Sequence, residues 1–484
     1  MKRNLLLTII LLFSMGLFAQ TQKGYSIGVS LKPFKNTFVY LGYYYGPKKG
    51  LADSVKLDAN GKGVISGKEP LPGGIYFLVS PHKEILFDIL IDKQQHFSVS
   101  ADSAALPESV VFTGSTDNSV FQKYTNYANT VGESMGKANE SLAKAASKED
   151  TLAIRKELRQ YGEQLEKFRD SMLRQYPNSI MAALFSAMKD PEVPPASQHP
   201  GGKYDTAYAF RYYKSHYWDG VEFGDERMIR TPFFETKLDR YFRDLVAPAA
   251  DSIIKEVDHI ILFSRGNKET YQYFMVYFVQ KYITPEYMGQ DAVFVHLFEK
   301  YINTGQTDFF TQEYMDYMKK RAYSLMANLI GLPAANLDMV DSTGKPTPLY
   351  GVNANLTVVC FWDPTCSHCK ETVPRVDSIY RAKWKAMGVA MYGVMTDGGM
   401  DNWKKFIKEK KLDKGWIHVY QLASKREADE KAQRPSYKQL YDVYQTPLLY
   451  LLDKDKKIIA KKLTFEQMDE VITLKNKKST TPKP

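Results

Sequence analysis

Cysteine is scarce in this chain: its 484 residues include only three, and all lie within ten positions, at Cys360, Cys366 and Cys369. Exported domains that depend on disulfides for stability spread their cysteines along the chain. A disulfide-stapled scaffold is therefore not what this pattern indicates. A membrane-spanning run is missing too, because the apolar stretch near the amino terminus, residues 5–13, is much shorter than the ~20 residues a span needs.

The first twenty residues predict export. Lys2 and Arg3 precede the apolar stretch, and the small residue Ala19 stands before Gln20. A charged start, a short apolar core and a small residue before the cut are typical of a secretory signal peptide, here residues 1–19. No cysteine lies near the cut, so lipid attachment is not expected. We expect a mature chain without a membrane span, in the periplasm of a Gram-negative bacterium.

Charge adds little about partners. The formal net charge is +10 and falls to +8 without Lys2 and Arg3. Part of the excess lies in the Lys-rich end, residues 475–484, whose Pro and Thr residues predict a disordered basic tail. Nucleic acid is not an expected partner of an exported chain that lacks a recognisable binding motif.

Residues 22–115 alternate apolar and polar side chains in short runs. Turn-forming residues separate the runs, as at Asn60-Gly61 and Pro72-Gly73-Gly74. Short strands with this punctuation predict an antiparallel β-sandwich. The six predicted strands are residues 37–43, 64–66, 75–80, 85–91, 96–100 and 110–113. No catalytic cluster occurs here, so a docking or spacing role is expected.

Residues 116–329 change to helical periodicity. One amphipathic stripe repeats every three or four residues from Ile154 to Met172, between a cap at Ser147 and a stop at Tyr176-Pro177. Further helices are predicted at residues 206–217, 236–245, 251–263, 268–282, 291–302 and 313–329. Two aromatic-rich stretches, residues 204–218 and 271–282, fit either a helical core or a groove for polypeptide or sugar. The core interpretation is favoured.

The chemistry is concentrated around Cys366 and Cys369. Residues 356–362 form a continuous apolar run typical of a buried parallel strand, and Val373, Val376 and Ile379 follow at helical spacing. A Cys-x-x-Cys pair between strand and helix is typical of a thioredoxin-like redox site. Free N–H groups at the helix start lower the pKa of the first cysteine from ~8.5 toward ~3.5–7.5.

Residues 330–474 resemble the thioredoxin-fold domain of the TlpA/ResA kind, exported thiol–disulfide oxidoreductases. The lead-in at residues 330–345 is similar to that family's "G-x-x-A-P-x-F-x-L-x-D-x-x-G-K" segment, and Trp362 matches the Trp ahead of the active site. Pro447, after Thr446, matches the family's cis-proline, and residues 448–463 match its final β-hairpin. The two preceding regions resemble a small β-domain and a helical domain of unknown function that occur ahead of such domains.

This sequence departs from the family in three places. Cys360 stands where cytoplasmic thioredoxins have a buried Asp, and Thr372 where cytochrome-maturation members have Glu. The dipeptide between the cysteines, Ser367-His368, is similar to the Pro-His pair of periplasmic oxidants. The direction of electron flow, as a reductant, an oxidant or an isomerase, therefore stays open.

The resemblance implies a role for each site residue. Cys366 would attack a protein disulfide as a thiolate, and Cys369 would resolve the mixed disulfide. His368 would stabilise the thiolate. Trp362, Thr446 and Pro447 would bind the substrate, with the Thr446 backbone facing an extended strand. The redox-active disulfide would need no other cofactor, and a membrane or periplasmic reductant would recycle it.

Other interpretations remain open. Copper could bind two thiolates, whereas a closed zinc site needs four ligands and the Cys-x-x-Cys pair with His368 does not supply them; no metal is expected. Cys360 is either a third redox thiol or a small buried hydrophobe. The alternative function is an exported binding or scaffold protein whose thioredoxin domain docks a partner or handles a metal such as copper.

Overall fold

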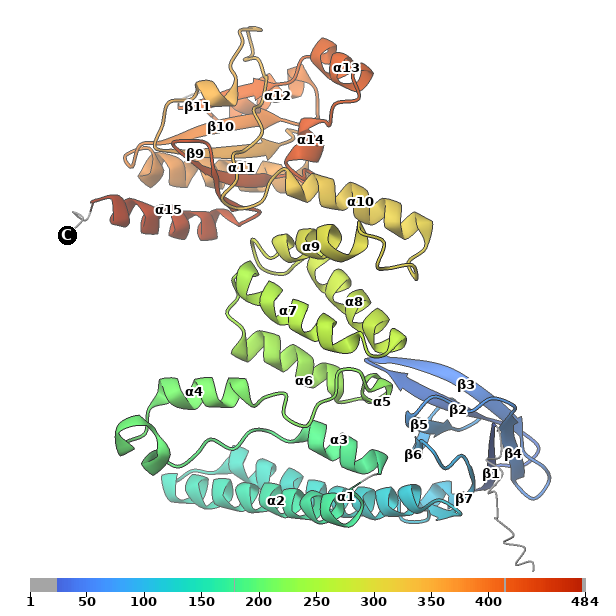
Figure 1. Ribbon diagram of the computed structural model, residues 1–484. Coiled ribbons are helices and arrows are strands. Elements are labelled where there is room, and N and C mark those ends of the chain that lie inside the picture. Colours follow the sequence, from blue (N-terminus) through green and yellow to red (C-terminus); the bar gives the residue numbers. More distant parts are fainter. Residues whose placement is uncertain (1–23, 178, 413–414, 481–484) are drawn as a thin grey trace, which may run out of the picture. The chain divides into compact units, whose positions relative to one another are not determined.

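The computed structural model describes residues 24–177, 179–412 and 415–480 (Figure 1). The predicted signal peptide, residues 1–19, lies outside the described residues. The chain divides into two compact units, residues 1–240 and 241–484. Within the described residues, no helix is long and apolar enough to cross a membrane. The predicted order of β-sheet, helical and α/β regions is confirmed.

The amino-terminal region is a sandwich of two four-stranded sheets with strand orders β4-β1-β7-β8 and β3-β2-β5-β6. Both sheets contribute to one hydrophobic core; in β1, for example, Ile27, Val29 and Leu31 are buried between more exposed neighbours. The strands are β1 (Tyr25–Lys32), β2 (Phe38–Tyr45), β3 (Lys48–Lys56), β4 (Lys62–Gly67), β5 (Gly74–Val79), β6 (Ile85–Ile91), β7 (His96–Asp102) and β8 (Val111–Thr113).

Two details differ from the sequence prediction. The strands β1 and β3 were not among the predicted runs. The pairing of β1 with β7 is parallel. The prediction of an entirely antiparallel sandwich was therefore wrong for this pair of strands. More than sixty residues separate these strands, and such a long connection does not impose the antiparallel pairing that a short hairpin does.

Helices follow the sandwich in the first unit. They are α1 (Thr116–Lys144), α2 (Lys148–Gln175), α3 (Ile180–Met188), α4 (Thr206–Ser215), α5 (Glu226–Ile229) and α6 (Phe234–Arg240). The predicted cap of α2 is present: the Ser147 hydroxyl accepts a hydrogen bond of 2.9 Å from the Asp150 N–H. Such a cap satisfies one of the free N–H groups of the first turn.

The second unit begins with a π-helical turn (Tyr241–Leu245), and α-helices follow it. They are α7 (Ala250–Ser264), α8 (Lys268–Ile283), α9 (Asp291–Leu297), extended by a π-helical turn (Phe298–Ile302), and α10 (Gln312–Met326). Most aromatic residues of α8 pack inward: Tyr273, Phe274, Phe278 and Tyr282 are buried, whereas Tyr271 and Tyr277 are partly exposed. For α8, this burial supports the interpretation as a helical core rather than the interpretation as a groove for polypeptide or sugar.

An α/β domain completes the second unit. Its five-stranded sheet has the order β11-β10-β9-β12-β13, and β9, β10 and β11 are parallel. The strands are β9 (Leu356–Trp362), β10 (Val389–Met395), β11 (Trp416–Tyr420), β12 (Leu448–Asp453) and β13 (Ile458–Lys461). The helices are α11 (Ser367–Ile379), α12 (Met400–Glu409), α13 (Ala423–Lys431), α14 (Tyr437–Leu440) and α15 (Phe465–Thr480).

Each face of this sheet carries its own core. Val358, Cys360 and Trp362 of β9 pack with α11, α12 and α15 on one face, and Val359 and Phe361 pack on the other face. A strand buried on both faces needs a continuous apolar sequence, which explains the run at residues 356–362. Because β9 and β10 are parallel, the loops that follow them lie at the same edge of the sheet.

The prediction of a disordered tail at residues 475–484 was wrong for the first residues of that range. Helix α15 continues to Thr480, and residues 481–484 lie outside the described part. Met468 and Ile472 anchor the earlier turns of α15 in the core. Because no proline or glycine follows before Pro482, the helix propagates through the Lys-rich segment at little cost.

Candidate active site

The candidate site is the loop between β9 and α11. Cys366 is the N-cap residue of α11 and makes no side-chain capping bond, so its sulfur lies beside the free N–H groups of the first turn. Asp363 shapes the loop, because its carboxylate accepts hydrogen bonds from the N–H (2.7 Å) and the hydroxyl (2.6 Å) of Thr365. The loop therefore holds the first cysteine at the helix start.

The two cysteines differ in exposure. Cys366 is partly exposed, whereas Cys369 is fully buried in the core beneath it. Both are free thiols. The Asp363 N–H donates to the Cys369 sulfur at 3.4 Å, and the Cys366 thiol donates to the Thr446 carbonyl at 3.5 Å. A reagent from solution can therefore reach the first sulfur but not the second.

The pKa values of the two thiols move in opposite directions. The Cys369 backbone N–H is the main group that lowers the pKa of Cys366 below its ordinary value of 9.0; the Thr446 side chain, the Cys369 thiol and the His368 N–H act the same way, while burial opposes them. Burial raises the pKa of Cys369 to about 11. A thiolate is the nucleophilic form of cysteine, so this arrangement favours attack by Cys366.

Thr446 and Pro447 reach the site from the loop before β12. Their peptide bond is cis, and both residues are partly exposed. The Thr446 carbonyl faces Cys366, so the fold brings together two positions that are eighty residues apart in sequence.

Trp362 and His368 differ from the roles expected of them. The Trp362 ring is fully buried and packs on Phe406 with ring centroids 5.3 Å apart, so direct substrate contact is ruled out by burial; the ring supports the loop from below. The His368 imidazole is exposed and has no hydrogen bond or ion pair among those of the described residues. Its backbone N–H, rather than its ring, acts on Cys366.

Cys360 lies on β9 between Gly393 of β10 and Leu449 of β12. The side chain is fully buried within the apolar core, and burial raises the pKa of its thiol. These surroundings fit the small buried hydrophobe rather than the third redox thiol.

A second loop at the site, after β10, was not predicted from the sequence. The Thr396 N–H donates to the Trp362 carbonyl at 2.9 Å. Gly398 has φ +90°, and a Cβ there would lie 2.5 Å from an Asp363 carboxylate oxygen. Only glycine fits this close approach and this backbone conformation. The pair Gly398-Gly399, shortly after the apolar run at residues 389–395, was the available signal.

Metal binding gains no support from side-chain clusters. Among the described residues, no group of three or more His, Cys, Asp or Glu side chains could hold a metal ion.

Comparison with known proteins identifies two regions. The AhpC/TSA family matches residues 330–461, and a domain of unknown function, DUF5106, matches residues 134–324. Among curated proteins, no sequence matches the chain.

Three solved structures illustrate the similarity. A domain of a possible thiol-disulfide isomerase from Cytophaga hutchinsonii is 35% identical over 32% of this chain and 97% of that one (TM-score 0.27). The thioredoxin domain of a thiol-disulfide oxidoreductase from Bacteroides vulgatus is 28% identical over 30% and 97% (TM-score 0.25). A thioredoxin-like protein from Bacteroides caccae is 21% identical over 59% and 99% (TM-score 0.45).

The first of these similarities extends over nearly the whole of the related domain at 35% identity, and the match to the AhpC/TSA family covers the same part of this chain. The chain therefore belongs, through its carboxyl-terminal thioredoxin-fold domain, to the thioredoxin-like thiol–disulfide oxidoreductases of the AhpC/TSA family.

Proposed function

We propose that this protein is an exported thiol–disulfide oxidoreductase that acts on protein disulfides through Cys366 and Cys369. The observation that carries the proposal is the contrast between the two thiols. The accessible one has a lowered pKa at the start of a helix, and the buried one has a raised pKa. A nucleophile backed by a protected resolving thiol is what disulfide exchange requires.

The reaction proceeds in two exchanges. The Cys366 thiolate attacks one sulfur of the substrate disulfide, forms a mixed disulfide and releases the other sulfur as a thiolate. Cys369 then loses its proton and attacks the Cys366 sulfur, which forms the Cys366–Cys369 disulfide and releases the second substrate thiol. Two electrons pass to the substrate, so an external dithiol reductant must restore the pair; an oxidase would run both steps in reverse.

Substrate would lie against the loop at Thr446 and Pro447. Both residues are partly exposed, and the Thr446 carbonyl already faces the Cys366 sulfur. A backbone carbonyl at this distance suits an extended polypeptide, whose own N–H groups can pair with it. The amino-terminal pattern of residues 1–19 supports export, with the periplasm as the proposed compartment.

Reduction of insulin by dithiothreitol tests the proposal. The wild type should accelerate the reaction, and Cys366→Ser should abolish the acceleration because no nucleophile remains. Cys369→Ser should instead accumulate a mixed disulfide with insulin, visible by mass spectrometry. Cys360→Ser is the matched control and should retain most of the activity.

A contrary result is well defined. If the wild type and Cys366→Ser both leave the insulin reaction unchanged but bind the same partner equally, the chain acts as a binding or scaffold protein. Full activity of Cys366→Ser would remove Cys366 from the role proposed for it.

A further inference from the structure

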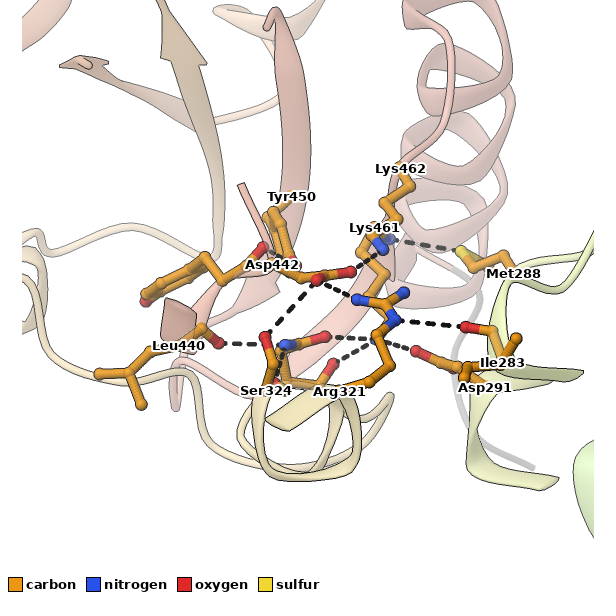
Figure 2. Close-up of polar contacts among 12 residues, drawn as sticks. Ile283, Met288, Asp291, Arg321, Ser324, Leu440, Asp442, Tyr450, Lys461 and Lys462 are labelled. Atoms are coloured by element: carbon orange, nitrogen blue, oxygen red, sulfur yellow. Dashed lines mark hydrogen bonds and ion pairs between the residues drawn. The ribbon is translucent and has the colours of Figure 1, made fainter. Parts of the chain in front are cut away.

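A buried polar cluster joins α10 to the segment that leads into the Thr446–Pro447 loop. The Asp442 carboxylate, 1% exposed, forms ion pairs with Arg321 of α10 and with Lys462. The Ser324 hydroxyl donates to the Gln439 carbonyl at 2.6 Å. Figure 2 shows the side chains of Arg321, Asp442 and Lys462 turned toward one another. We call Arg321, Ser324, Asp442 and Lys462 the Arg321–Asp442 cluster.

Arg321 is itself firmly held. Its Nε donates to the Ile283 carbonyl at 3.3 Å, in addition to the ion pair with Asp442 (Figure 2). Its side chain is only 10% exposed. An arginine fixed at two points of its planar head has little rotational freedom left, so it provides a rigid surface for a neighbouring ring.

That neighbouring ring belongs to Tyr444. The Arg321 guanidinium carbon lies 5.8 Å from the centroid of the Tyr444 ring. Tyr444 is nevertheless 74% exposed, more than any other large hydrophobic side chain in the described part of the chain. An aromatic ring that is supported on one side and open to water on the other is suited to contact with another molecule.

The position of Tyr444 relates it to the redox site. Tyr444 and Thr446 are two residues apart, so their Cα atoms are separated by at most ~7 Å. The Thr446 carbonyl in turn faces the Cys366 sulfur. A disulfide that reaches Cys366 would therefore bring the residues flanking its cysteine toward the Tyr444 ring, since an extended chain advances ~3.3 Å per residue.

We propose that Tyr444 contacts the polypeptide that carries the substrate disulfide, and that Arg321 holds its ring in place. This inference rests on the proposed function and names a determinant of its substrate class. Tyrosine is enriched at protein contacts because it offers a large apolar surface with few rotatable bonds. A small disulfide can react with Cys366 without covering Tyr444, so the ring discriminates polypeptides from small molecules.

The experiment compares two disulfides in single-turnover reactions of the pre-reduced, full-length protein. Insulin is the polypeptide, and 2-hydroxyethyl disulfide is the small molecule. Tyr444→Ala should slow the reaction with insulin about three- to tenfold, the range expected for one aromatic contact. The rate with 2-hydroxyethyl disulfide should stay within about twofold of the wild-type rate, because the sulfur chemistry is untouched.

Two further variants complete the test. Tyr350→Ala removes another exposed tyrosine (48% exposed), just before the amino end of β9 and away from Cys366, and should change neither rate. Arg321→Lys keeps the positive charge but loses the planar head, so it should slow the insulin reaction alone.

The outcomes separate the inference from the proposed function. A wild type that reacts with neither disulfide overturns both. Parallel slowing of both reactions by Tyr444→Ala, or no slowing of either, overturns the inference while the proposed function stands. An unchanged insulin rate in Arg321→Lys overturns the role of Arg321.

Discussion

Two regions next to the Thr446–Pro447 loop place their ionisable groups in opposite environments. In the redox loop, the Cys366 thiol is partly exposed, donates to the Thr446 carbonyl at 3.5 Å, and has neutral hydrogen-bond partners that include the backbone N–H groups of Cys369 and His368. In the Arg321–Asp442 cluster, the buried Asp442 carboxylate has two cationic partners, Arg321 and Lys462. The first group is accessible and held by neutral hydrogen-bond partners, whereas the second is enclosed and paired with opposite charges.

The difference separates reactivity from stability. Hydrogen bonds from neutral groups favour the Cys366 thiolate, and its partial exposure leaves the sulfur free to attack. A buried carboxylate without partners would be costly, so its surroundings must supply them. The Arg321–Asp442 cluster therefore fixes the position of the Thr446–Pro447 loop, which contacts the Cys366 sulfur. Four predictions test this division.

The largest effect is expected from breaking the cluster. Asp442→Asn should lower the free energy of unfolding by about 3–5 kcal/mol, because the largely buried Arg321 guanidinium loses its ion-pair partner. Urea unfolding at neutral pH, followed by tryptophan fluorescence, measures this; four of the five tryptophans lie in the α/β domain. Asp455→Asn changes an exposed carboxylate and is the control. Equal stability of the two variants would contradict the cluster's role.

The same variant has a defined pH dependence. Burial would raise the pKa of Asp442, but Lys462 and Arg321 outweigh it and hold that pKa below its ordinary 3.8. A carboxylate with a depressed native pKa stabilises the fold fully above its unfolded pKa, and this stabilisation is lost as pH falls through the native value. The stability gap between wild type and Asp442→Asn should therefore be constant near neutral pH and shrink below about pH 4.

The next effect lies within the cysteine pair. Because the pKa of Cys366 is lowered and burial raises that of Cys369 to about 11, the thiolate fraction near neutral pH is larger at Cys366. Iodoacetamide should therefore label Cys366 first, with a rate that rises through a midpoint below pH 9. Mass spectrometry of the alkylated peptide identifies the site. Preferential labelling of Cys369 would reverse the assignment of nucleophile and resolving thiol.

The smallest effect concerns position 368. His368→Pro removes a backbone N–H that acts on the Cys366 sulfur, and should raise the Cys366 pKa and lower the reduction potential. A shift of ~30 mV corresponds to ~1.4 kcal/mol for this couple, and the wild type should lie above thioredoxin's ~−270 mV.

His368→Ala separates the ring from the backbone. It keeps the N–H and removes only the imidazole, which is exposed. If the backbone is the cause, His368→Ala matches the wild type in potential and thiolate titration, and only His368→Pro differs. A shift in His368→Ala as large as in His368→Pro would assign the effect to the imidazole.

Local patterns made much of the fold predictable. The apolar run at residues 356–362 indicated the strand β9, and the cysteines at its end indicated the start of α11. The parallel pairing of β1 with β7 was not predictable, because the partners are distant in sequence and no short turn fixes their direction. Trp362 was misjudged for a related reason: the sequence showed its place beside the site but not that the core encloses it.

By itself, the sequence determined which chemistry is available: two cysteines three positions apart, between a strand and a helix whose N–H groups favour a thiolate. Only the tertiary structure decided how these groups are divided between solvent and core. It buries Cys369 and Trp362, brings Thr446 to Cys366 across eighty residues, and places Arg321 beside Asp442 and Tyr444 across more than a hundred. Hydrogen-bonding and helix propensity act locally along the chain, whereas burial and ion pairing depend on which distant segments pack together.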